Sequence, residues 1–141
     1  MVEPYDPACV NPASIDLTLS DEFGLLLDDG QVEFFTSDHI YVEPGQAILA
    51  SSIEYIRMPE IAAGTVYLKS SRAREGLDHA LAGWVDPGFE GTLTLEIHSH
   101  RSLRLAAGQR VIQLVLSQML EQPEQLYQGR YQGQTGPTMA R

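Results

Sequence analysis

Apolar and polar residues alternate along several short stretches of the chain, and this period of two is typical of half-buried β-strands. Between residues 92 and 98, Leu93, Leu95 and Ile97 face one way, while the polar residues between them face the other. The pattern predicts strands at residues 65–69, 92–98, 101–105 and 110–116, with weaker candidates at residues 15–19, 31–35, 41–42 and 47–51.

No window carries a long apolar stripe at helical spacing, and the one predicted helical turn, residues 71–75, ends at Gly76. Proline and glycine separate the short strands, which predicts an all-β sandwich or barrel over residues 1–120. Residues 121–141 are polar and rich in Gln and Gly, so their composition predicts a flexible arm. The alternative is an arm whose tyrosines and arginines order over a ligand or a neighbouring subunit.

The composition of the 141 residues fits one globular domain, because 43% are hydrophobic and 20% are charged. The chain has neither an apolar run of membrane length nor a signal peptide, which predicts a soluble cytoplasmic protein with no membrane partner. The formal net charge of −10 argues against broad binding to nucleic acid. The single cysteine, Cys9, excludes an intrachain disulfide and a thiolate zinc cluster.

Basic residues are scarce in this chain, and several of them cluster between Lys69 and Arg74 in the run KSSRAR. The run is predicted where a strand meets a helical turn, so backbone N–H groups, hydroxyls and cations could meet an anion there. The alternative is a solvated turn whose basic groups balance acidic neighbours, and composition alone favours this second interpretation.

Residues 82–91, AGWVDPGFEG, form a second candidate site, in which Asp-Pro-Gly signals a tight turn. Trp84 and Phe89 flank Asp86, either as anchors of a β-hairpin or as the wall of a pocket in which Asp86 accepts a hydrogen bond from a sugar hydroxyl. Glu96 is either solvated or lines a cleft, where partial burial would raise its pKa and suit it to proton transfer.

The four histidines, His39, His79, His98 and His100, lack the spacing of a metal site and are interpreted as surface or structural residues. The zinc deaminase signature is absent, and so are the common phosphate-loop, hydrolase and kinase motifs.

Five ordered segments resemble motifs of the dCTP deaminase branch of the dUTPase-like superfamily, almost from end to end of the chain. They are residues 11–17 (NPASIDL), 69–77 (KSSRAREGL), 82–96 (AGWVDPGFEGTLTLE), 108–114 (GQRVIQL) and 130–141 (RYQGQTGPTMAR). The resemblance implies a distorted jelly-roll β-sandwich that forms a homotrimer with active sites at the subunit interfaces. It implies hydrolysis of the 4-amino group of dCTP to give dUTP and ammonia, without zinc and with Mg2+ bound through the triphosphate.

The resemblance also assigns catalytic roles. Glu96 would accept a proton from the attacking water and deliver one to the leaving amine. Ser70 would hold that water or the amine, Arg74 would orient the network, and the backbone carbonyl of Ala82 would position the water.

Nucleotide contacts are assigned in the same way. Asp86 would bind the deoxyribose 3′-hydroxyl, Trp84 would form the pocket wall, and the Thr94 backbone would read the pyrimidine edge. The predicted phosphate contacts are Lys69, Ser71 and Gln113, with Arg72 reaching a phosphate or a neighbouring subunit. The arm residues predicted to close over the nucleotide are Tyr127, Arg130 and Gln134.

Residues 77–81 form a link that is short for the branch, and Leu81 stands where many members carry a threonine that bears on feedback by dTTP. Two other functions stay open. A dUTP pyrophosphatase, or an enzyme that performs both steps, would use Asp86 to activate water, but the pyrophosphatases lack a glutamate at the position of Glu96. The other open function is that of a non-catalytic nucleotide-binding regulator, and the joint presence of Ser70, Arg74 and Glu96 argues against it.

Overall fold

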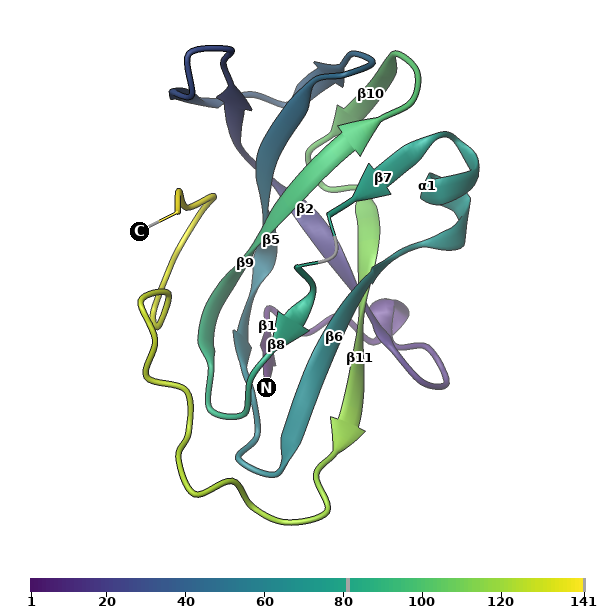
Figure 1. The fold of residues 1–141 in the computed structure, drawn as a ribbon. Helices are drawn as coiled ribbons and strands as arrows, with labels where there is room; N and C mark the ends of the chain where they lie inside the picture. The colour runs from purple at the N-terminus through teal and green to yellow at the C-terminus, as the bar shows by residue number, and fades with distance from the viewer. Residues whose placement is uncertain (81, 141) are drawn as a thin grey trace.

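The computed structural model describes residues 1–80 and 82–140, and nearly all of their regular structure is β-strand (Figure 1). The strands are β1 (Val2–Glu3), β2 (Ile15–Leu26), β3 (Val32–Thr36), β4 (His39–Val42), β5 (Ala47–Arg57), β6 (Ala62–Leu68), β7 (Leu77–His79), β8 (Trp84–Val85), β9 (Glu90–Ser99), β10 (Leu103–Ala106) and β11 (Arg110–Gln118). The helical segments described are α1 (Ser70–Arg74) and the 3₁₀ turn η1 (Pro7–Cys9). The predicted all-β fold is confirmed.

Nine strands form one curled sheet in the order β7-β9-β5-β2-β11-β6-β8, with β1 paired to β5 and β3 paired to β2. A separate ribbon pairs β4 with β10. The long strand β2 explains the curl, because its first residues pair with β11 and its later residues pair with β5 and β3. Since β7 and β8 are close in sequence but lie at opposite ends of the strand order, the two ends of the sheet approach each other.

The apolar face of the curled sheet forms the core. Leu93, Leu95 and Ile97 of β9 are 7%, 1% and 0% exposed, which confirms the alternation predicted for this strand. They belong to a cluster that also contains Phe23, a fully buried residue of β2. The intervening Glu96 is only half-buried, because it faces away from this core.

The strand predicted at residues 47–51 continues to Arg57 through a polar run that interrupts the hydrophobic pattern. Ser52 and Glu54 of this run are nevertheless buried. The Ser52 hydroxyl accepts a hydrogen bond from Leu93 N at 2.9 Å, and Glu54 Oε2 accepts one from Thr18 N at 2.9 Å. These side chains satisfy backbone donors where the β5 register shifts, so buried polar residues here belong to the strand.

The tight turn predicted around Asp86 is present, but it does not close a β-hairpin. Phe89 N donates to Asp86 O at 3.2 Å, and Gly88 adopts a φ of 79°, which a residue with a side chain rarely does. The strands on either side separate, since β8 pairs with β6 and β9 pairs with β5 and β7. The hairpin interpretation was therefore wrong, and the turn instead connects the two ends of the curled sheet.

The C-terminal arm leaves β11 and returns along the outer edge of β9 in the same chain (Figure 1). Thr92 N donates to Gln134 O at 3.0 Å, and the Gln134 side-chain amide donates to Thr92 O at 2.8 Å. Further along, Gly133 N donates to Glu90 O at 2.7 Å. The arm is thus ordered against its own chain, although its composition alone resembles a flexible segment.

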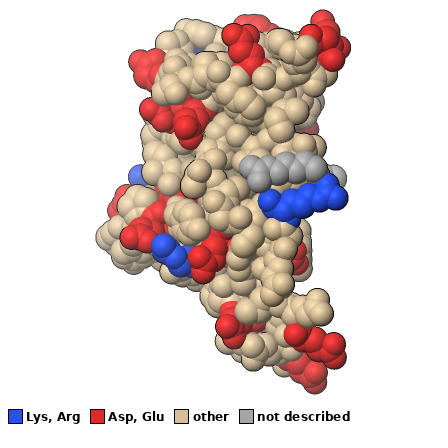
Figure 2. Space-filling view, turned by 90° about the vertical axis from the view of Figure 1, so that its left-hand side faces the viewer, with Lys and Arg blue, Asp and Glu red and all other residues tan. Residues whose placement is uncertain are grey.

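The face that carries the arm shows acidic side chains from its upper to its lower end and fewer basic ones (Figure 2), in keeping with the net charge of −10. Within residues 1–80 and 82–140, no helix has the length and apolar character that a membrane crossing requires.

Candidate active site

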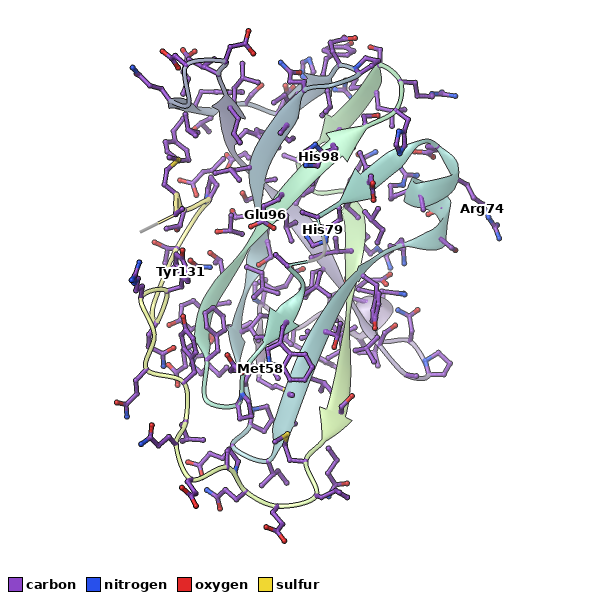
Figure 3. The ribbon with its side chains drawn as sticks, in the orientation of Figure 1. Met58, Arg74, His79, Glu96, His98 and Tyr131 are labelled. Carbon is purple, nitrogen blue, oxygen red and sulfur yellow. The ribbon has the colours of Figure 1, made fainter. Side chains whose placement is uncertain are left out.

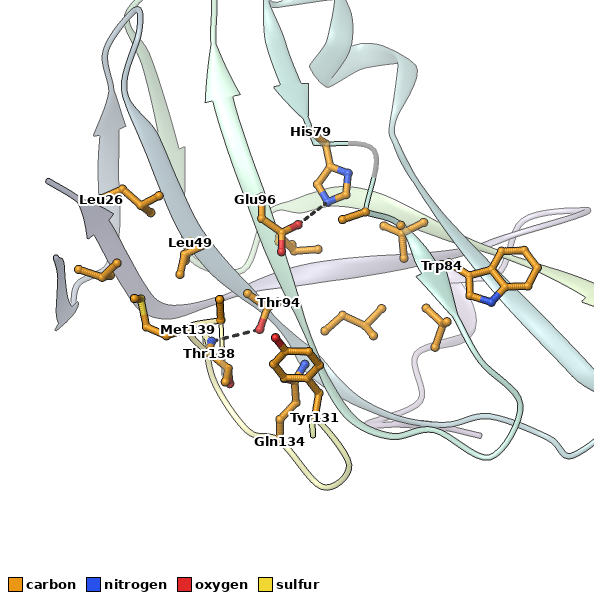
Figure 4. Close-up of a pocket in the computed structure, with 18 of the residues that line it drawn as sticks. Leu26, Leu49, His79, Trp84, Thr94, Glu96, Tyr131, Gln134, Thr138 and Met139 are labelled. Atoms are coloured by element: carbon orange, nitrogen blue, oxygen red, sulfur yellow. Dashed lines mark hydrogen bonds and ion pairs between the residues drawn. The ribbon is translucent and has the colours of Figure 1, made fainter. Parts of the chain in front are cut away.

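A cavity of about 670 Å³ lies where the two ends of the sheet approach each other (Figure 4). Strand β9 forms one wall, β6 and β8 form the opposite wall, and the β2–β3 hairpin and the C-terminal arm border it. The predicted site residues that line this cavity are Ala82, Trp84, Asp86, Thr94, Glu96, Tyr127 and Gln134. The fold therefore brings together most of the groups predicted to contact the base and sugar, from segments far apart in the sequence.

Glu96 projects from β9 into the cavity (Figure 3). Its side chain is 37% exposed, yet its Oε2 atom is buried and has no hydrogen-bond partner among the described residues. Burial raises the pKa of Glu96 above its ordinary value, while its own backbone N–H and the charge of His98 oppose this rise. A raised pKa makes this carboxylate a stronger base than a solvated glutamate, which suits a group that accepts a proton and later returns it.

His79 lies directly beside Glu96, although the sequence analysis interpreted it as a surface or structural residue. Strand β7 pairs with β9, so His79 stands opposite Ile97, and Ala80 N donates to Glu96 O at 3.0 Å. The His79 side chain is 7% exposed, and its Nε2 atom is 3.9 Å from Glu96 Oε2 (Figure 4). Burial lowers the pKa of His79, which favours the neutral imidazole, while the charge of Asp78 opposes this fall.

Trp84 and Asp86 shape the opposite wall. The indole Nε1–H of Trp84 donates to Asp86 Oδ1 at 2.8 Å, which fixes the carboxylate at the mouth of the cavity. Trp84 is 63% exposed, whereas Phe89 is 6% exposed and packs edge-to-face on Tyr127 of the arm. The two aromatics thus differ in environment: Phe89 is packed beneath the turn, and Trp84 leaves a flat apolar surface exposed beside the cavity.

The arm closes the cavity along β9. Thr138 N donates to Thr94 Oγ1 at 3.1 Å (Figure 4), and Tyr131 and Met139 complete this border. Thr94 stands opposite Ser51 in the β5–β9 register, so its backbone is already part of the sheet.

The cationic run predicted to bind phosphate lies outside this cavity. Lys69 Nζ forms an ion pair with the buried Asp16 carboxylate, which also accepts a hydrogen bond from Asn11 at 2.9 Å. Arg72 pairs with Glu75 at 2.9 Å, one turn along α1. No residue of α1 is buried.

The remaining residues predicted to bind or orient the substrate are also outside the cavity. Ser70, Ser71 and Arg74 are exposed, and Arg74 points away from Glu96 (Figure 3). Gln113 stands on β11 opposite Asp16, and Arg130 is an exposed residue of the arm. Leu81, the residue tied above to feedback regulation, is outside the described residues.

Known proteins resemble this chain over nearly its whole length. The family described as dCTP deaminase-like matches residues 1–119. The chain belongs to the dCTP deaminase-like family. A curated relative named "dCTP deaminase, dUMP-forming" from Sulfurihydrogenibium sp. is 36% identical and aligns with 99% of this chain and 87% of its own. A protein of the same name from Aquifex aeolicus is also 36% identical, over 99% of this chain and 84% of its own.

Solved structures support the same fold for this dCTP deaminase-like chain. A 2'-deoxycytidine 5'-triphosphate deaminase from Agrobacterium tumefaciens superposes with a TM-score of 0.69 at 20% identity, covering 82% of this chain and 42% of that longer one. A dUTPase from phage phi11 of S. aureus superposes with a TM-score of 0.61 at 12% identity, covering 93% and 97%. The curled sheet is therefore the dUTPase-like fold.

Proposed function

We propose that this dCTP deaminase-like protein hydrolyses the 4-amino group of dCTP and then releases pyrophosphate to leave dUMP. The observation that carries the proposal is the Glu96 carboxyl, which faces a cavity of nucleotide size while its Oε2 atom is buried. The sequence resemblance implied dUTP as the product, whereas the names of the curated relatives specify dUMP. We therefore assign dUTP to the intermediate position of a two-step reaction.

The first step needs a group that moves protons in both directions. Water adds to C4 of the cytosine ring as Glu96 accepts one of its protons, and the C4–N bond breaks as Glu96 returns that proton to the amine, which leaves as ammonia. The second proton of the water moves from the new hydroxyl to N3, which gives the uracil ring. The raised pKa of Glu96 suits this exchange, because a fully solvated glutamate is a weak base and a reluctant donor near pH 7.

The second step needs a water directed at the α-phosphorus atom. Asp86 is the candidate base, since it lines the same cavity and its carboxylate is held by the Trp84 indole at 2.8 Å. Attack by water breaks the bond between the α- and β-phosphates and releases pyrophosphate. Two carboxylates in one cavity thus support two hydrolyses of one nucleotide.

The phosphates need positive charge, which the described lining of this chain's cavity does not supply. Its described lining contains no Lys or Arg, whereas the exposed α1 presents Ser70, Ser71 and Arg74 to solvent. We propose that a homotrimer places α1 of one copy at the cavity of the next. The described residues contain no group of three or more His, Cys, Asp or Glu side chains that could hold a metal, so Mg2+ would enter on the triphosphate oxygens and offset their charge.

One assay tests the reaction. The protein is incubated with dCTP and Mg2+, and ammonia, dUTP, dUMP and pyrophosphate are followed together. Ammonia with equimolar dUMP and pyrophosphate supports the proposal, whereas accumulation of dUTP would restrict it to the first step. Pyrophosphate from added dUTP without ammonia from dCTP would indicate a dUTP pyrophosphatase, and bound but unchanged nucleotide would indicate a regulator.

Variants separate the two steps and the two copies. Glu96→Gln should abolish ammonia release but leave pyrophosphate release from dUTP, whereas the exposed Glu90→Gln on the same strand should behave like the wild type. Co-expression of Glu96→Gln with Arg74→Ala should restore deamination, because some mixed sites then combine two intact residues. Failure to restore it, with mixed trimers present, would place both residues in one copy's site.

A further inference from the structure

We propose that His79 is a positioning residue for the deamination, in which its Nε2–H hydrogen-bonds to Glu96 Oε2 when nucleotide fills the cavity and so directs Oε1 at the reacting water. This inference rests on the proposed function and deepens it. It starts from two buried polar atoms that lack partners among the described residues, His79 Nε2 and Glu96 Oε2. The two atoms are 3.9 Å apart across one wall of the cavity (Figure 4).

Unpartnered buried polar atoms are rare because each loses its hydrogen bonds to water. Here the two unpartnered atoms are complementary, since an imidazole N–H can donate a hydrogen bond and a carboxylate oxygen can accept it. A separation of 3.9 Å is longer than a hydrogen bond, but catalytic hydrogen bonds are often long before the substrate binds and shorten in its complex. A rotation of the Glu96 side chain that moves Oε2 by less than about 1 Å would complete the hydrogen bond.

The backbone already fixes the pair. Strands β7 and β9 are hydrogen-bonded neighbours, and Ala80 N donates to Glu96 O at 3.0 Å. His79 is 7% exposed, so its ring has little freedom to turn toward solvent. A base held by a third group is the general arrangement of proton-transfer sites, and β7 supplies that third group here.

Several other ionisable groups lie near the pair, and among them Asp78 acts on the pKa of His79 and His98 acts on the pKa of both partners. The same cavity is lined by Asp86, which directly follows β8, and by Tyr127 and Tyr131 of the arm. His98 lies two residues after Glu96, on the same face of β9. Asp78 precedes His79, but its carboxylate is 61% exposed and lies 3.9 Å from His100 Nε2. Among these, His79 is the group whose buried ring nitrogen faces the buried oxygen of Glu96.

The proposal predicts a specific change in the pH profile. A donated hydrogen bond stabilises the charged carboxylate, so it lowers the pKa of Glu96 from the value that burial alone would give. Because Glu96 must be deprotonated to accept a proton, kcat falls as the pH drops through its pKa. Removing the donor should therefore move the acidic limb of the kcat profile to higher pH by about one unit.

The test compares two replacements of His79 with a matched control. His79→Phe removes the donor, and His79→Gln keeps an N–H at similar reach, while His100→Phe changes an exposed histidine. For His79→Phe we expect kcat for ammonia release to fall about tenfold at neutral pH and the acidic limb to shift, with KM for dCTP within about twofold of the wild type. His79→Gln should recover most of the rate and the original limb.

A second measurement separates a positioning role from a loss of fold. On the Glu96→Gln background, which releases no ammonia, His79→Phe should leave the release of pyrophosphate from dUTP at the rate of the single variant, because the effect of His79 passes through Glu96. Coincident pH profiles for His79→Phe and the wild type would overturn the proposal, and so would a Gln variant as slow as the Phe variant. If the wild type releases no ammonia from dCTP, the proposed function itself fails, and that result is seen before any variant is made.

Discussion

Gln134 holds the C-terminal arm on β9, and its replacement by alanine should loosen the arm without touching the walls of the cavity near Glu96. The Gln134 side-chain amide donates to Thr92 O at 2.8 Å, while the backbone of the same residue accepts from Thr92 N at 3.0 Å. The Gln134→Ala variant keeps the backbone bond and loses the side-chain bond. A typical net contribution of one such hydrogen bond is about 1 kcal/mol, which corresponds to about a fivefold increase in the undocked population of the arm.

Amide hydrogen exchange measures this population directly. Gly133 N donates to Glu90 O at 2.7 Å and Thr138 N donates to Thr94 Oγ1 at 3.1 Å, so both amides report docking. Their exchange should accelerate about fivefold in the variant, while amides of the core strands keep their rates. If the arm covers the nucleotide, KM for dCTP should rise by a similar factor.

The matched control is Gln128→Ala, which shortens an exposed glutamine of the same arm. This variant should exchange and turn over like the wild type. Unchanged exchange at Gly133 and Thr138 in Gln134→Ala would refute the reasoning, because it would mean that the side-chain bond does not hold the arm. Faster exchange with an unchanged KM would instead show a docked arm that has no part in nucleotide binding.

Three further predictions concern stability. Phe23→Ala should lower the free energy of unfolding by about 3–5 kcal/mol in urea denaturation, since Phe23 is fully buried. Asp16→Ala should lower it by about 3 kcal/mol, because it leaves the Lys69 ammonium beside a buried site without its partner, whereas the exposed Asp21→Ala should have little effect. Glu96→Gln should raise the Tm at neutral pH. A carboxyl group whose pKa is raised by folding destabilises the folded protein at pH values above its folded pKa, and it has no such effect below its unfolded pKa. The increase in Tm should therefore vanish as the pH falls below about 4.

Regular alternation predicted the strands of the core well, and irregular features account for what it missed. The pattern located β9, β11 and most of β6, because their apolar residues share one face of the sheet. It ended β5 too early at residue 51, since the polar residues that follow it are buried against backbone donors rather than solvated. β7 and β8 are three and two residues long, too short for any periodicity to reveal.

Some residues of the candidate site could be identified from the local sequence, whereas other contacts of the site form only when the chain folds. Glu96 was considered because it is a carboxylate in a strongly patterned strand, and its catalytic role came from the resemblance, whereas Asp86 was considered because it lies in a recognisable turn. His79 was not found, since its meeting with Glu96 depends on the pairing of β7 with β9. The arm's path along β9 was equally hidden, because backbone hydrogen bonds between Thr92 and Gln134 leave no trace in composition.

The curl of the sheet explains why unpartnered polar atoms persist in an otherwise well-packed protein. A flat sheet would expose the outer face of β9 to water, and Glu96 would then be an ordinary solvated carboxylate with its usual pKa. Because the curl brings β8 and the arm over that face, Glu96 Oε2 and His79 Nε2 lose water without gaining a hydrogen-bond partner among the described residues. Such an arrangement costs stability, which a site recovers only when a ligand or its attacking water provides the missing hydrogen bonds.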